Sequence, residues 1–210
     1  MTSGMEPERA ALLFKGGVPR FPEKTLLTLA LVLSLTTSDP FVAEATSSAS
    51  YEVNIPRDSL RLFVDDIGLF SRHMPGVVSV REAGPDRYVY LTEKELPLAG
   101  TMQTEFDICK RVSGDSVFVY ESIDPAADNY MLNRVTIRPV DAERTSITID
   151  LKVKLKRESG GDVHWLAPIL GEAFISKQMA NDLDDMLATF IESSNGELYD
   201  RLRSSPRASR

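Results

Sequence analysis

The sequence predicts an α+β domain built from an antiparallel sheet of about seven strands and one long C-terminal helix. Three observations support this fold class. Residues 146–156 alternate between apolar and polar side chains, which is typical of an antiparallel strand with one buried and one solvated face. Other strand patterns precede this segment and are separated by turn residues. After it, apolar residues recur at helical spacing almost to the end of the chain.

The first elements are one strand and two short helices. The strand is predicted from Ser50 to Ile55 and ends at a proline. Asp58 or Ser59 is expected to cap the next segment, in which apolar residues recur at helical spacing as far as residue 67. A second short helix is predicted over residues 69–74, because Pro75-Gly76 would end it there.

Six further strands follow in the prediction. Their apolar residues alternate with polar ones, and turn residues such as Gly84-Pro85 and Ser113-Gly114 lie between them. The predicted strands are Val77 to Arg81, Arg87 to Glu95, Thr101 to Arg111, Val117 to Ile123, Asn129 to Pro139 and Ser146 to Lys156.

The last predicted element is a long helix with one apolar stripe. Pro168 suits its first turn, where a missing N–H costs nothing, and Asn195-Gly196 is expected to end it. Residues 204–210 are expected to form a disordered tail. The predicted stripe consists of Ile169, Leu170, Ala173, Phe174, Ala180, Leu183, Met186, Leu187, Phe190 and Ile191.

Composition excludes several classes of protein. The chain has 210 residues, a formal net charge of −7 and a pI near 5.0. Nucleic-acid binders need a basic surface to meet phosphates, so no nucleic-acid partner is expected. Cys109 is the only cysteine and there are two histidines, His73 and His164, so we expect no disulfide, no metal centre and no cofactor.

Residues 1–45 are expected to form a leader, followed by a single domain over residues 46–203. The apolar run at residues 25–37 is shorter than the roughly 20 residues of a spanning helix and has the length of a signal-peptide core. Ala43-Glu44-Ala45 predicts cleavage after Ala45, and therefore export to the periplasm or the extracellular space; otherwise the protein is cytoplasmic. Acidic residues before the run leave an uncleaved anchor, an extra amphipathic helix or a mis-set start codon as alternatives.

Three short segments carry a resemblance to a known superfamily. They are Tyr51-Glu52-Val53-Asn54-Ile55-Pro56, Leu62-Phe63-Val64-Asp65-Asp66 and His73-Met74-Pro75-Gly76-Val77-Val78-Ser79-Val80. With the order of the elements, they resemble the SRPBCC or START-like superfamily. Among its branches, the chain looks most like the polyketide cyclase or coenzyme Q-binding group and the group of carbon monoxide dehydrogenase accessory proteins.

The resemblance implies a helix-grip fold, in which a curved sheet wraps around the C-terminal helix and encloses a cavity for an apolar ligand such as a lipid, quinone or polyketide. Methionines and aromatic residues suit such a ligand, since they adapt to irregular apolar shapes. The alternative is a filled core in which the same side chains pack against one another. The residues we expect at the cavity are Tyr51, His73, Met74, Met102, Phe106, Tyr130, Met131, Leu170, Phe174 and Met186.

Charged clusters have structural interpretations. The acidic residues at positions 181–185 lie mainly off the apolar stripe and lack the spacing of a magnesium site, so we interpret them as a solvated face. Lys152, Lys154 and Lys156 form a basic strip that keeps one sheet face soluble or makes a peripheral membrane contact. His73 is a candidate ligand donor or general base, but no acid–base pair emerges, so no catalytic residue is assigned.

Three functions fit these features. The first is non-catalytic binding, with transport, of a hydrophobic small molecule or lipid in the internal cavity. The second is a polyketide cyclase- or dehydratase-like enzyme, for which His73 and Tyr130 are the residues to test. The third, which rests on the resemblance to the carbon monoxide dehydrogenase group, is an accessory protein for metalloenzyme maturation or membrane recruitment.

Overall fold

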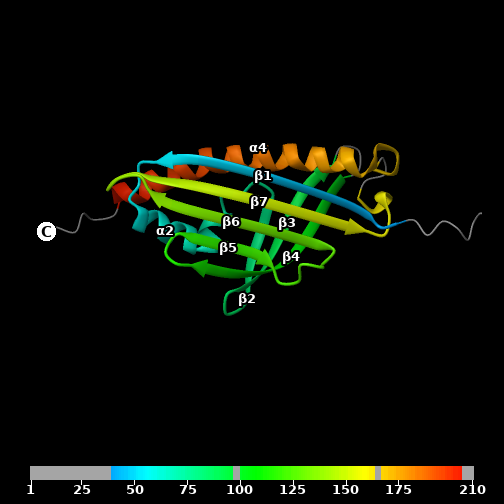
Figure 1. Cartoon of the computed structure of the whole chain (residues 1–210), viewed down its shortest axis with the longest axis horizontal. Coiled ribbons are helices and arrows are strands. Elements are labelled where there is room, and N and C mark those ends of the chain that lie inside the picture. The colour runs from blue at the N-terminus through cyan, green and yellow to red at the C-terminus, as the bar shows by residue number, and fades with distance from the viewer. Residues whose placement is uncertain (1–38, 97–99, 164–166, 205–210) are drawn as a thin grey trace, which may run out of the picture. The chain divides into compact units, whose positions relative to one another are not determined.

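The computed structural model describes residues 39–96, 100–163 and 167–204 (Figure 1). An antiparallel sheet, two short helices after its first strand and a long C-terminal helix confirm the predicted fold class. The elements in chain order are β1 (Phe41–Val53), α2 (Arg57–Asp65), α3 (Ile67–Ser71), β2 (Val77–Gly84), β3 (Arg87–Leu96), β4 (Gly100–Ser113), β5 (Val117–Ser122), β6 (Asn129–Pro139), β7 (Thr145–Arg157), a single 3₁₀ turn (Gly160–Asp162) and α4 (Ala167–Ser204).

The sheet has seven strands in the order β1-β7-β6-β5-β4-β3-β2, and all neighbours are antiparallel. The β6 strand has the predicted bounds, and β7 is one residue longer at each end than predicted. In β7, Ile147, Ile149 and Leu151 are buried while the residues between them are partly exposed, as their alternation predicts.

The first strand begins much earlier than predicted. It starts at Phe41 and pairs with β7 along its whole length, so the predicted domain boundary at residues 45 and 46 lies inside β1. Ala43 and Ala45, which resemble a signal-peptidase site, are buried core residues with 0% and 4% exposure. Small side chains fit at these inward positions because the 3₁₀ turn and α4 pack close to the strand there.

Helix α4 runs beside β1 (Figure 1) and covers this edge of the sheet. The backbone N–H of Val42 donates to the Glu172 carboxylate at 2.6 Å, and that of Glu44 donates to the Ser176 hydroxyl at 3.1 Å. These bonds give partners to backbone donors that an edge strand would otherwise leave open to another chain. The helix is thus fixed along β1 by polar contacts as well as by the core.

The apolar stripe of α4 differs from the predicted one. Gly171, at φ 79° and ψ 164°, is not helical and separates Ile169 and Leu170 from the rest, and both are exposed. Phe174 is also exposed, at 50%, because it is nine positions from the buried Leu183, which at about 100° per residue is the opposite helix face. Asn195-Gly196 does not end the helix, which continues to Ser204.

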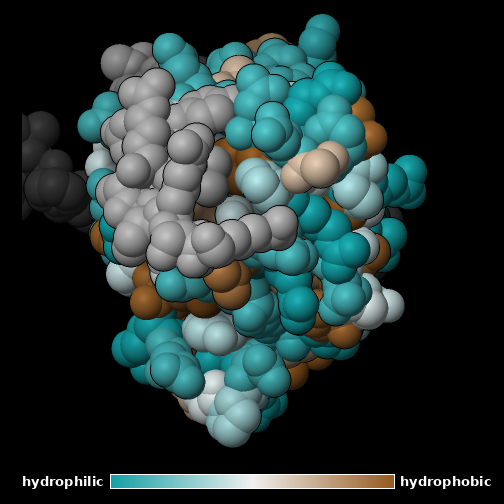
Figure 2. Space-filling view, turned by 90° about the vertical axis from the view of Figure 1, so that its left-hand side faces the viewer, coloured by the Kyte–Doolittle hydropathy of each residue, from teal (hydrophilic) through white to brown (hydrophobic). Residues whose placement is uncertain are grey.

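Helices α2 and α3 close one end of the space between α4 and the sheet. The ring of Phe70 in α3 lies between Phe190 of α4 and Tyr120 of β5, with centroid distances of 4.8 Å and 6.2 Å. The Asp66 side chain accepts the N–H of Leu69 at 3.0 Å and caps α3, whereas neither predicted cap of α2 is used, since that helix begins at Arg57. The surface at the end where α2 lies is mainly hydrophilic (Figure 2).

Among the residues that the structure describes, no helix is long and apolar enough to span a membrane.

Candidate functional site

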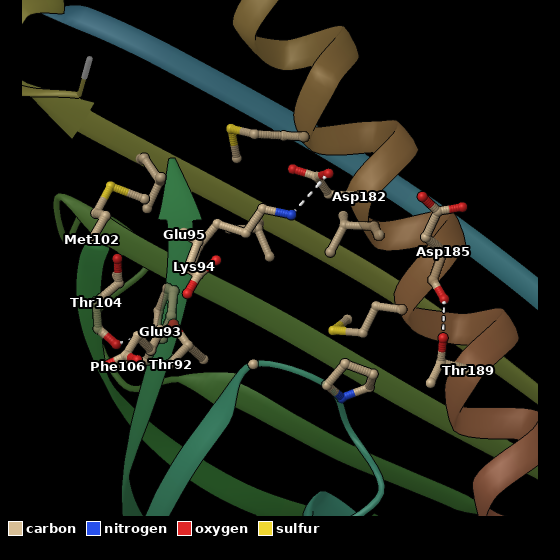
Figure 3. A pocket seen from close by; sticks show the side chains of 17 residues that line it. Thr92, Glu93, Lys94, Glu95, Met102, Thr104, Phe106, Asp182, Asp185 and Thr189 are labelled. Carbon is tan, nitrogen blue, oxygen red and sulfur yellow. Dashed lines mark hydrogen bonds and ion pairs between the residues drawn. The ribbon is translucent and has the colours of Figure 1, made fainter. Parts of the chain in front are cut away.

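A cavity of about 410 Å³ lies between α4 and the sheet (Figure 3). This volume falls within the roughly 300–1,000 Å³ of ordinary small-molecule sites. The walls come from the turn after α3, from β3, β4 and β7, and from the middle of α4. The lining residues are Pro75, Gly76, Thr92, Glu93, Lys94, Glu95, Met102, Thr104, Phe106, Val153, Leu155, Met179, Asp182, Leu183, Asp185, Met186 and Thr189.

The deep part of this cavity is apolar because of the periods of the strand and the helix. Alternate residues of β4 point inward, which brings Met102, Thr104 and Phe106 to one wall. On the opposite wall, Leu183 and Met186 are three positions apart on α4 and share a face. Thioether, phenyl and aliphatic groups therefore face each other across the cavity, the surface that an apolar ligand needs.

Gly76 brings the turn after α3 against the cavity wall. Its φ is +78°, a conformation that side chains rarely adopt, and its carbonyl accepts the N–H of Glu93 at 2.7 Å. A Cβ at this position would lie 3.0 Å from the Glu93 carbonyl oxygen, which is tighter than ordinary contact. Glycine thus allows the turn to pack directly on β3.

Charged side chains surround the mouth of the cavity. Lys94 of β3 forms an ion pair with Asp182 of α4, with Nζ and Oδ1 3.0 Å apart (Figure 3). Glu93 accepts a hydrogen bond from Gln103 Nε2 at 2.8 Å, while Glu95 and Asp185 are exposed. Asp182 and Asp185 therefore line the cavity mouth, and the interpretation of their cluster as only a solvated face is corrected.

Comparison with known proteins identifies the fold. No family model matches the sequence, and no curated protein matches it in sequence. Among solved structures, the aromatase/cyclase Zhui from a Streptomyces species is 17% identical, covers 77% of this chain and 98% of its own, and has a TM-score of 0.52. A START superfamily protein from Mycobacterium smegmatis is 14% identical, covers 73% of this chain and 98% of its own, and has a TM-score of 0.51.

The chain has the SRPBCC/START-like helix-grip fold. A conserved protein from Geobacillus kaustophilus is similar as well, with 12% identity, 74% of this chain and 95% of its own covered, and a TM-score of 0.52. At such identities the likeness establishes the helix-grip fold, and the function has to be argued from the site.

The helix-grip arrangement brings three of the ten predicted residues to the cavity, namely Met102, Phe106 and Met186. Met74 and Met131 are buried in the main core, with 4% and 8% exposure, and do not line it. These two side chains fit the filled-core alternative, which thus applies to part of the predicted set.

Two predicted residues lie toward the C-terminal part of α4, away from the cavity lining. His73 Nδ1 is 2.8 Å from the Ser193 hydroxyl, and its ring packs near Phe63 and Phe190. Tyr51 forms a hydrogen bond with Ser194, and burial raises the pKa of its hydroxyl to about 12. Both side chains hold the helix to its neighbours.

The remaining three predicted residues point elsewhere. Tyr130 donates to Glu121 Oε1 at 2.8 Å and lies under Lys154 Nζ, which is 5.6 Å from the ring centroid. Its neighbour Met131 belongs to the core, and successive strand residues face opposite sides, so Tyr130 lies on the outer face. Leu170 and Phe174 are exposed on α4, for the reasons of helix phase given above.

Several lining residues were missed although a signal for them exists. Thr104 lies between Met102 and Phe106 in the inward period of β4, and Val153 and Leu155 continue the alternation of β7. Gly76 was recognised only as part of a turn. By contrast, the approach of Lys94 to Asp182 has no sequence signal, since it depends on how β3 and α4 pack.

Polar groups also occur in the core. Asn133 on β6 is 6% exposed, and its Oδ1 accepts no hydrogen bond from the described residues. Burial raises the pKa of the Tyr90 and Tyr120 hydroxyls well above the usual value, and Tyr120 donates to the Val64 carbonyl. Within the described residues, no group of three or more acidic, histidine or cysteine side chains could hold a metal ion.

Proposed function

We propose that this helix-grip domain binds and carries a hydrophobic small molecule or lipid, without chemical change, in the cavity between α4 and the sheet. The observation that carries the proposal is the 410 Å³ cavity with Met102, Phe106, Leu183 and Met186 facing one another. Burial of apolar ligand surface there supplies binding energy at about 25 cal/mol per Å².

The test is a titration of the delipidated full chain with the neutral fluorophore N-phenyl-1-naphthylamine. We expect saturable binding of one probe per chain, with displacement by dodecanol. Met102→Asp should weaken binding more than about tenfold, because it places a carboxylate in the apolar wall. Thr101→Asp adds the same charge at the exposed neighbouring position and should bind like the unmodified protein. Absence of saturable binding, or equal loss in both variants, would refute the proposal.

A cyclase-like activity is the second candidate, favoured by the similarity to the Zhui aromatase/cyclase. The ionisable groups of the cavity lining are those at its mouth, where Lys94 and Asp182 form their ion pair, so these would have to act as acid and base. Conversion of a linear poly-β-ketone mimic to a cyclic product, lost in Lys94→Met, would support the enzyme. Recovery of the mimic unchanged from a saturated complex would support the carrier.

Export through an N-terminal signal is a separate proposal, supported by the apolar run at residues 25–37. Because β1 begins at Phe41, a processed protein that keeps its first strand has to be cut before that residue, not after Ala45. Sequencing the N-terminus of the protein purified from its own host tests this, and a terminus at residue 46 would refute it.

Peripheral membrane contact through the lysine strip is supported less well. Lys152 pairs with Glu44 at 2.7 Å and Lys156 with Asp128 at 3.5 Å, so neighbouring carboxylates offset much of the positive charge. Co-sedimentation with vesicles containing phosphatidylserine tests the contact, and Lys152→Gln/Lys156→Gln should reduce it if the strip is responsible.

A further inference from the structure

We propose that the cavity mouth selects its ligand by charge, admitting neutral or cationic apolar molecules and discriminating against those with a carboxylate head, such as free fatty acids. This inference rests on the proposed binding function and names the chemical class of the ligand. Its basis is the combination of an apolar interior with an acidic rim on one and the same cavity.

The rim has an excess of negative charge. The lining contains the four carboxylates of Glu93, Glu95, Asp182 and Asp185 and the single ammonium group of Lys94. Two elements supply them, since the first two carboxylates lie on β3 and the other two on α4, so the negative charge flanks the opening from both walls. With ordinary protonation at pH 7 the lining carries a net charge of −3.

The one cation of the lining is already engaged. Lys94 Nζ lies 3.0 Å from Asp182 Oδ1, and Figure 3 shows its side chain extended across the opening toward that residue. A carboxylate head would therefore have to compete with Asp182 for the ammonium group while approaching three further carboxylates. A trimethylammonium or hydroxyl head meets no such penalty.

The magnitude of the discrimination follows from Coulomb's law at an exposed site. A unit charge several ångströms away in high dielectric changes an affinity by about two- to threefold. With a net −3 at the rim, ligands of the same alkyl chain but opposite head charge should differ by about tenfold or more at low salt. The difference should shrink strongly near 1 M salt, where the screening length is about 3 Å.

The experiment compares three ligands with the same 12-carbon chain on the full chain at pH 7.5 and low salt. Dodecyltrimethylammonium, dodecanol and dodecanoate, all below their micelle concentrations, displace N-phenyl-1-naphthylamine. We expect dodecanoate to bind at least about tenfold more weakly than dodecyltrimethylammonium, with dodecanol between them or equal to the cation.

A matched pair of variants assigns the effect to the rim. Glu95→Gln/Asp185→Asn should raise the affinity for dodecanoate about fivefold and lower that for the cation. Glu82→Gln/Glu143→Gln removes the same charge from exposed residues outside the lining and should change neither. Equal effects of the two double variants would overturn the assignment to the rim.

The outcomes separate this inference from the proposed function. If dodecanol does not bind, the binding function itself fails. If dodecanol binds but dodecanoate binds as tightly or more tightly, only the charge selection is overturned. In that case a loss of dodecanoate affinity in Lys94→Met would show that the ammonium group receives the carboxylate.

Discussion

Filling the cavity from α4 should weaken ligand binding without unfolding the protein. Met186 lines the cavity and is only partly buried, so the bulkier indole of Met186→Trp can enter the empty space with little strain. We expect it to displace roughly two methylene groups of a bound alkyl chain. Each buried methylene contributes about 0.8 kcal/mol, so the loss is about 1.6 kcal/mol, or roughly 15-fold in Kd.

The assay is displacement of N-phenyl-1-naphthylamine by alcohols of 8, 10, 12 and 14 carbons, with thermal unfolding measured in parallel. In the unmodified protein, affinity should rise by roughly 15-fold for each two carbons until the cavity is full. In Met186→Trp this rise should stop about two carbons earlier, while the unfolding midpoint stays the same or increases because a void is filled.

Ala188→Trp is the matched control, since it adds the same side chain to α4 at an exposed position outside the lining. It should bind the whole series like the unmodified protein. If Met186→Trp is folded and yet shows the same affinities and the same chain-length limit, the ligand does not occupy this cavity and the reasoning is refuted.

Three predictions concern the fold. Burial raises the pKa values of Tyr51, Tyr90 and Tyr120 above the usual 10, so their contribution to stability is complete below pH 10 and is lost as the pH rises toward 12 and beyond; Tyr90→Phe should make the fall in unfolding midpoint above pH 10 shallower. Asn133→Leu removes a buried carbonyl that lacks a donor among the described residues and should raise the free energy of unfolding by about 1–2 kcal/mol in urea titrations, whereas a decrease would show that the amide is satisfied. A chain that begins at Thr46 loses the buried Phe41, Ala43 and Ala45 and should unfold at a lower temperature than one that begins at Asp39, and equal midpoints would contradict the role of this part of β1.

The strands that sequence reasoning located well are those with a clear period of two. Asn129–Pro139 and Thr145–Arg157 alternate apolar and polar residues over ten or more positions, so their identity as strands is written locally. The first half of β1 is rich in alanine, serine and threonine and has no such contrast. Its strand conformation depends on pairing with β7 and on the hydrogen bonds from Val42 and Glu44 to α4.

The cavity was predictable only in part for the same reason. Strand parity brings Met102 and Phe106 to one face once either is placed inside, but it also separates Tyr130 from Met131, which sequence reasoning had put together. On α4, an error of half a turn exchanges inside for outside, as Phe174 shows.

By itself, the sequence determined the order of the elements, the antiparallel sheet, the long closing helix and an apolar ligand class, because periodicity, turn residues and side-chain chemistry are local properties. Only the tertiary structure decided where β1 begins, which face of α4 looks inward and which residues form the mouth. Lys94 and Asp182 are far apart in the chain and come within 3.0 Å because β3 and α4 pack on opposite sides of one opening. No local pattern encodes that distance, since it depends on the curvature of the whole sheet around the helix.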